Sequence, residues 1–154
     1  MLSLSLPRTI TTKLEESLLK AGNLECGGIL LGEHVGVNEF AVREITIQGI
    51  GTVSRFVRKV EGAIAALGKF FKRHGNDYAR FNYLGEWHSH PLFEPEPSSV
   101  DHNSMVEIVT NPEVGANFAV LVIVKLNERR QLIGSAHVYL PDRRVFEATL
   151  DIQR

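Results

Sequence analysis

The feature that most constrains the fold is an apolar run at residues 116–126, Ala-Asn-Phe-Ala-Val-Leu-Val-Ile-Val-Lys-Leu. Most of its residues are apolar and many are β-branched, which favours a strand. A strand that is apolar on both faces must be covered on both faces. The run therefore predicts the central strand of a sheet that has other elements packed on either side.

Further strands are expected on both sides of this run, and helices are interspersed among the strands that precede it. Period-two or apolar patterns predict strands at residues 2–6, 25–32, 40–47, 81–90, 131–140 and 144–150. We expect one domain, residues 1–154, because the chain shows no repeat, linker or low-complexity tract. The interspersed order predicts an α/β (α+β) fold, with a single mixed β-sheet flanked by helices.

Three helices are expected, each with its own start and stop signals. Thr12 and Glu15 form a capping-box pattern, which predicts that the first helix opens there and stops at Gly22. The second is expected at residues 57–74, after a glycine loop at 49–51, and the third at 98–110. Their expected inner faces are Val60, Ile64, Leu67 and Phe71 in the second helix, and Val100, Met105, Ile108 and Val109 in the third.

Composition excludes several classes of function. The net charge of −1 argues against a general nucleic-acid binder, and the basic residues of the second helix are best interpreted as a solvated face. No apolar run reaches ~18 residues, so no membrane span is predicted. The N-terminus lacks the pattern of a signal peptide, and the one cysteine, Cys26, cannot form an intrachain disulfide. We therefore expect a cytoplasmic protein that binds neither nucleic acid nor membrane.

The pattern that carries chemistry lies at the end of the strand expected at 81–90. His88 and His90 are two residues apart, so their side chains point to the same face of that strand. A proline-rich loop follows, and then Ser98 and Asp101 open the third helix. The loop can bring the helix start over the strand end, which would make Asp101 a third ligand. Two histidines and one carboxylate leave a coordination position open, as catalytic zinc sites do.

Each of these residues also has a simpler interpretation. Ser98 and Asp101 resemble an ordinary helix N-cap, and a single histidine on a strand is more often a satisfied polar residue than a ligand. Glu86 shares a face with the histidines and is either a partner for a ligating histidine or a solvated acid. The spacing of all four positions together favours the metal site.

The full stretch resembles the JAMM motif of the JAB/MPN metalloproteases, and its amino-acid sequence looks most like that of the prokaryotic JAB subgroup. The residues that carry this resemblance are Gly85-Glu86-Trp87-His88-Ser89-His90-Pro91 with Ser98 and Asp101, preceded by Glu25-Cys26-Gly27-Gly28-Ile29-Leu30-Leu31-Gly32. The resemblance implies the MPN/JAB fold, which is cytidine-deaminase-like. It also implies one Zn²⁺ per chain.

The resemblance further implies a role for each matching position. His88, His90 and Asp101 would hold zinc, and Glu25 would be the catalytic base that takes a proton from the attacking water and passes it to the leaving amine. Ser98 would donate a hydrogen bond to the developing oxyanion. Without the resemblance, the residues alone do not favour Glu25 over Glu86 as the base.

The implied activity is that of a zinc isopeptidase or peptidase. It would cleave after the C-terminal glycine of a ubiquitin-like protein bound through its extended tail, with E1-like and E2-like pathway partners and a possible place in a bacterial defence operon. Trp87 and the loop at 91–97 are expected to form or support the substrate channel. The alternatives are a hydrolase that matures or recycles a sulfur-carrier protein, and a non-catalytic MPN-type scaffold.

Overall fold

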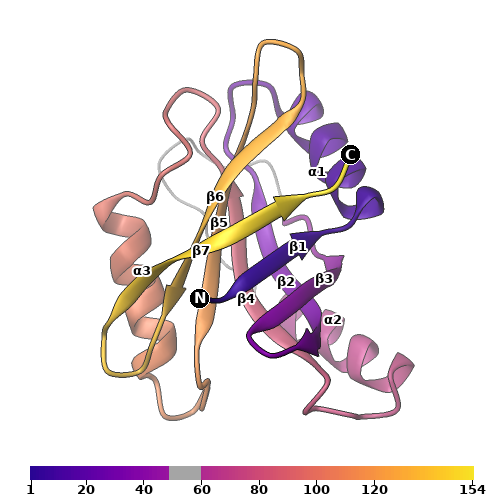
Figure 1. Cartoon of the computed structure of the whole chain (residues 1–154), viewed down its shortest axis with the longest axis vertical. Helices are drawn as coiled ribbons and strands as arrows, with labels where there is room; N and C mark the ends of the chain where they lie inside the picture. Colours follow the sequence, from indigo (N-terminus) through magenta and orange to yellow (C-terminus); the bar gives the residue numbers. More distant parts are fainter. Residues whose placement is uncertain (49–59) are drawn as a thin grey trace.

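A computed structural model describes residues 1–48 and 60–154, and within these ranges the helices are interspersed among the strands as the sequence predicts (Figure 1). The expected loop at 49–51 and the first three residues of the helix expected at 57–74 lie outside the described residues. The elements are β1 (Ser3–Leu6), α1 (Arg8–Ala21), β2 (Gly27–Gly36), β3 (Glu39–Ile45), α2 (Val60–Arg73), β4 (Phe81–Ser89), α3 (Ser99–Thr110), β5 (Ala119–Leu126), β6 (Leu132–Tyr139) and β7 (Val145–Ile152).

The strands form one mixed sheet, as predicted, in the order β3-β2-β4-β5-β6-β7. The sheet curls until β1 pairs in parallel with both β3 and β7, which closes it; Figure 1 shows β1 beside the yellow β7. The parallel pair β4–β5 is connected through α3, and the helix start therefore lies near the carboxyl end of β4. This crossover brings the third helix to the histidines.

β5 is buried on both faces, which confirms the expectation for the apolar run. Val120, Val122 and Val124 face the interior of the curled sheet, where they share a core with α1. Leu121 and Ile123 face outward and pack beneath α3. The strand begins at Ala119, three residues later than the sequence pattern indicates. A third cluster packs α2 against the outer face of β2 around Phe70.

The expected start of the first helix is wrong. α1 begins at Arg8, four residues before Thr12, and Pro7 occupies the N-cap position. The carbonyl of Pro7 accepts from the amides of Ile10 and Thr11, because proline presets the backbone for a helix that starts directly after it. Glu15 is not part of a capping box; its carboxylate accepts a hydrogen bond from the amide of Leu132 at 2.9 Å. Gly22 ends the helix with a φ of 62°, as expected.

Two residues assigned to inner faces are in fact exposed. Ile64 is 65% exposed, since α2 contacts the sheet through Phe70, with Leu67 and Phe71 beside it. Val100 is 61% exposed, because it precedes Asp101 in the first turn of α3 and adjacent helix residues point about 100° apart. The other three expected inner residues of α3 are buried: Met105, Ile108 and Val109.

A bulge in β4 decides which way the histidines face. The pairing of β2 with β4 shifts between Leu30 and Leu31, opposite Gly85. Leu84 and Trp87 both lie in the inner core although they are three residues apart, which strict alternation would not allow. The shift therefore turns the following alternate residues toward the outer face, where α3 lies.

Replacing Gly85 with alanine should lower the free energy of unfolding by about 3 kcal/mol, by combined overpacking and backbone strain. Gly85 has a φ of 150°, and a Cβ there would lie 1.8 Å from the carbonyl oxygen of Val120. Denaturant unfolding measures the change. Gly68→Ala is the matched control, since a Cβ at Gly68 meets nothing within 4 Å and alanine favours a helix. Equal stability of the Gly85 variant and the wild type would contradict this account.

Among residues 1–48 and 60–154, no helix combines the length and the apolar character that crossing a bilayer requires.

Candidate metal centre

The end of β4 presents His88 and His90 on the outer face of the sheet. Their ring centroids are 5.1 Å apart, and both residues are buried, at 8% and 7% exposed. The alternate residues point inward: Trp87 donates from Nε1 to the Thr46 carbonyl at 2.9 Å, and the Ser89 hydroxyl accepts from the Cys26 amide at 3.0 Å. These contacts hold Trp87 and Ser89 on the inner face of the sheet. The alternate residues His88 and His90 must therefore both point outward, side by side.

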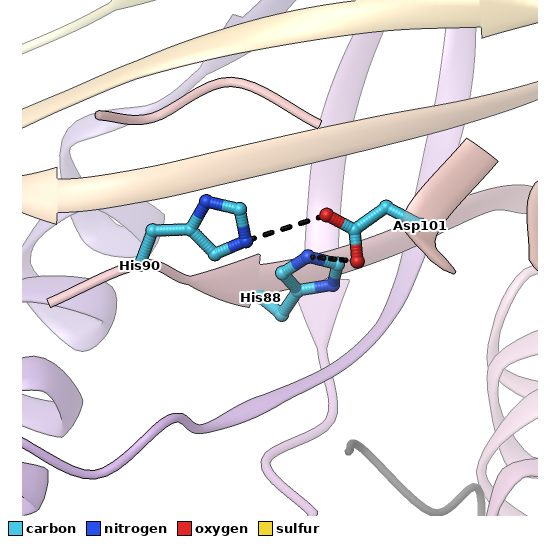
Figure 2. A group of neighbouring side chains, drawn as sticks. All are labelled: His88, His90 and Asp101. Atoms are coloured by element: carbon cyan, nitrogen blue, oxygen red, sulfur yellow. Dashed lines mark ion pairs between the residues drawn. The ribbon is translucent and has the colours of Figure 1, made fainter. Parts of the chain in front are cut away.

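The first turn of α3 brings Asp101 to the histidines (Figure 2). Its Oδ1 lies 3.1 Å from Nε2 of His88, and its Oδ2 lies 3.3 Å from Nε2 of His90. All three ligand atoms lie within 4.8 Å of one another. The crossover from β4 through α3 to β5 produces this meeting, because the helix begins beside the strand end that carries the histidines.

Ser98 is the N-cap of α3 and completes a capping box with Asp101. The Ser98 hydroxyl accepts from the Asp101 amide at 3.2 Å, and Oδ2 of Asp101 accepts from the Ser98 amide at 2.7 Å. A hydroxyl that accepts a hydrogen bond can still donate its own proton. The capping interpretation of Ser98 is therefore correct, and it leaves the exposed hydroxyl able to donate to a bound group.

The charges at the centre are strongly coupled. Burial raises the pKa of Asp101, but the imidazoles of His88 and His90 outweigh it and hold that pKa well below its usual range. The hydrogen bond to Asp101 raises the pKa of His90. The carboxylate is thus ionised at any physiological pH, while His90 binds its proton more tightly than a free histidine does.

These residues fit a divalent metal ion. Nδ1 of His90 lies 3.1 Å from the Glu94 carbonyl, which can only accept, so in the neutral ring Nε2 carries the lone pair. Nε2 of His88 is buried, is not aligned for a hydrogen bond with Asp101, and has no other partner among the described residues. A buried lone pair beside a carboxylate is costly unless a cation or a proton lies between them. A His₂-carboxylate set is one that zinc accepts.

Glu25 approaches the centre from the neighbouring strand. It lies two residues before β2, outside the strand that the sequence had predicted to include it. Gly27 pairs with His88, and the hydrogen bonds between Cys26 and Ser89 continue that register, so Glu25 comes opposite His90. Burial raises the pKa of Glu25, and the nearby imidazoles partly offset this. A half-buried carboxyl with a raised pKa is suited to proton transfer.

Glu86 lies one pleat before His88 on the same face of β4 and is buried, at 5% exposed. It also lines a cavity of about 850 Å³ over the outer face of the sheet. The lining residues near the sheet and the two flanking helices include Ile29, Ile64, Leu67, Tyr83, Ile108 and Phe118. The cavity thus lies along β4, between α2 and the segment 111–118 that follows α3, and Glu86 is the lining residue next to the histidines.

Several contributors to the centre carry no recognisable sequence signal. The Glu94 carbonyl that contacts His90 is a backbone group, and any residue at that position would supply one. Tyr139 is buried, and its hydroxyl lies 2.6 Å from Nδ1 of His102. Burial and the charge of Asp101 raise the pKa of Tyr139. Only the fold brings this tyrosine, which lies on β6, to the first turn of α3.

Comparison with known proteins identifies a family and several relatives of this chain. A family model described as prokaryotic homologs of the JAB domain matches residues 7–134. A protein from Enterobacter hormaechei named "CD-NTase/cGAS isopeptidase" is 34% identical over 110 residues, which cover 69% of this chain and 58% of that protein. A Vibrio cholerae protein with the same name is 29% identical over 92 residues, covering 58% of this chain and 56% of that protein. The chain thus spans little more than half the length of these relatives.

Two solution structures share the fold. A protein from Desulfitobacterium hafniense superposes with a TM-score of 0.70 at 17% identity, covering 98% of this chain and 93% of that one. A protein from Salinibacter ruber superposes with a TM-score of 0.59 at 18% identity, covering 97% and 91%. At such identities the likeness concerns the fold alone.

Proposed function

The chain belongs to the family of prokaryotic JAB domains, and from that premise we propose that it is a zinc-dependent isopeptidase or peptidase. It cleaves after the C-terminal glycine of a ubiquitin-like protein. The observation that carries this proposal is the convergence of His88, His90 and Asp101, with Glu25 opposite His90. The names of the two curated relatives support an isopeptidase activity in CD-NTase systems. We propose that the gene for this chain lies in a bacterial defence operon.

In this proposal His88, His90 and Asp101 hold one Zn²⁺ per chain. A bound zinc ion supplies Lewis-acid chemistry: it polarises a carbonyl and makes water acidic enough to react near neutral pH. The three protein ligands leave a coordination position open, as in catalytic zinc sites. The buried Nε2 of His88, the Nε2 of His90 and the ionised carboxylate of Asp101 lie close together, which supports this assignment.

We assign the proton transfers to Glu25 and the stabilisation of the developing negative charge to Ser98. The Glu25 carboxylate accepts a proton from the attacking water and delivers it to the leaving amine, and its raised pKa helps it hold the proton between these steps. The Ser98 hydroxyl donates to the carbonyl oxygen as negative charge develops on it. Glu86 remains the candidate for a supporting partner of a ligating histidine, because it lies on the same face of β4.

This cavity, between α2 and the segment that follows α3, is the place we assign to the substrate tail. It begins at Glu86 and follows the outer face of β4 as far as Asn82, a stretch of about 13 Å at strand rise, which accommodates about four extended residues. We expect a glycine at the cleavage point, because a residue without a side chain needs the least space between the helix start and the strand end. Trp87 cannot line this channel, since it is 0% exposed; it can only support the strand from inside.

Metal content and cleavage test the proposal together. Purified protein should contain about one zinc per chain. It should also cleave a ubiquitin-like protein extended beyond its C-terminal glycine, lose that activity on chelation and regain it with Zn²⁺. A sulfur-carrier protein with the same kind of extension separates the two substrate classes. Full cleavage after complete removal of metal would rule out the proposal.

Zinc affinity is expected to rise with pH through the ordinary histidine pKa of about 6.5 and above it, and zinc binding should release protons in that range. Asp101 raises the pKa of His90, so His90 remains protonated above the ordinary histidine value of about 6.5 and zinc must displace that proton. Calorimetry in buffers of different ionisation enthalpy measures the released protons. At pH values above the His90 transition, the part of this release that comes from His90 should disappear. A pH-independent affinity across this range would contradict the assignment of His90 as a ligand.

A further inference from the structure

Three successive carbonyls of the loop between β4 and α3 are each held by a side chain. The Phe93 carbonyl accepts from Nζ of Lys125 at 3.1 Å, and the Glu94 carbonyl accepts from Nδ1 of His90 at 3.1 Å. The Pro95 carbonyl accepts from the hydroxyl of Ser135. The middle contact orients a residue of the metal centre, and the two outer contacts tie the loop to the sheet.

The two outer donors come from neighbouring strands under the loop. Lys125 is the next-to-last residue of β5, and Ser135 lies on β6 opposite Ile123. His88 pairs with the same Ile123 from the other side, so the loop crosses the sheet directly beside the histidines. Three prolines in the loop, at 91, 95 and 97, have no amide to donate, which limits how far the loop can hold itself by its own backbone.

We propose that Lys125 and Ser135 are positioning residues of the metal centre. They hold the carbonyls on either side of Glu94, and so keep the Glu94 carbonyl on Nδ1 of His90. That hydrogen bond fixes the tautomer and the ring orientation, and Nε2 stays turned toward Asp101. The inference rests on the proposed function, since it assigns to His90 the role of a zinc ligand.

Removing either anchor should weaken zinc binding about 10-fold, the usual effect of losing a group that orients a metal ligand. The variants are Lys125→Met and Ser135→Ala, measured by chelator competition at a temperature where every variant is folded. The absorption spectrum of the Co²⁺-loaded protein should shift in both, because the His90 ring loses its fixed orientation. Lys125→Arg and Ser135→Thr keep a donor and should restore both the affinity and the spectrum.

Matched controls separate positioning from general stability. Ser17→Ala removes the same kind of bond, since the Ser17 hydroxyl donates to the Lys13 carbonyl at 2.8 Å within α1, and Lys13→Met removes an exposed lysine of the same helix. Neither control should change zinc affinity. Unchanged affinity and an unchanged Co²⁺ spectrum in the Lys125 and Ser135 variants would overturn the inference, even if their melting temperatures fall. Failure of the wild type to bind zinc would overturn the proposed function itself.

Discussion

Replacing Glu25 with glutamine should lower kcat by about 10³-fold, within the range that general acid–base catalysis contributes. The amide keeps the size of the side chain and can still hydrogen bond, but it can neither accept a proton from water nor deliver one to the leaving amine. Zinc content should stay at the wild-type level, because Glu25 is outside the cluster of His88, His90 and Asp101. Metal analysis and single-turnover cleavage measure the two effects on the same preparation.

Glu86→Gln is the matched control for this prediction. Both glutamates lie near the metal centre, but only Glu25 comes opposite His90 on the neighbouring strand, while Glu86 precedes His88 on the same strand. We expect the Glu86 variant to lose about 10-fold or less, the lower end for a group that supports a metal ligand. If Glu25→Gln still cleaves while Glu86→Gln does not, the base is Glu86.

Glu25 also marks the limit of what the residues alone could predict. Strand period places Glu86 on the face of the histidines, so local pattern favours it at least as much as Glu25. The base that we propose, Glu25, lies instead two residues before β2, some sixty residues earlier in the chain, and the register of β2 against β4 brings it opposite His90. Long-range register has no local signature, and only the family resemblance pointed to Glu25.

The predictable part of the fold was the part governed by local pattern. The apolar run became β5, buried on both faces, and the His-x-His spacing together with the following helix start brought three ligand atoms together. What escaped prediction depends on distant partners. β1 closes the sheet because it pairs with both edge strands, β3 and β7. The bulge at Gly85 depends on the carbonyl of Val120, which lies close to it on the neighbouring strand. The predicted start of α1 at Thr12 was wrong because the helix begins directly after Pro7, which occupies the N-cap position.

Replacing Asp101 with alanine should lower zinc affinity by more than about 100-fold and reduce cleavage in parallel, since it removes one of the three protein ligands that we propose. The same change also removes the acceptor that holds the Ser98 amide at 2.7 Å, so the start of α3 loses half of its capping box. A lost cap costs about 1 kcal/mol of stability. Activity alone therefore cannot tell a ligand from a cap at this position.

Asp101→Asn separates the two roles. The asparagine oxygen can still accept from the Ser98 amide, so the helix start and the melting temperature should change little. The negative charge is gone, and with it the group whose ionised form sits 3.1 Å from His88 and 3.3 Å from His90. We expect this variant to lose zinc affinity almost as fully as the alanine variant, while the pKa of His90 falls because its strongest raising influence is removed. NMR titration of the metal-free protein follows that pKa. If the asparagine variant binds zinc like the wild type, Asp101 serves only as a helix cap, and the two histidines must find their third ligand elsewhere.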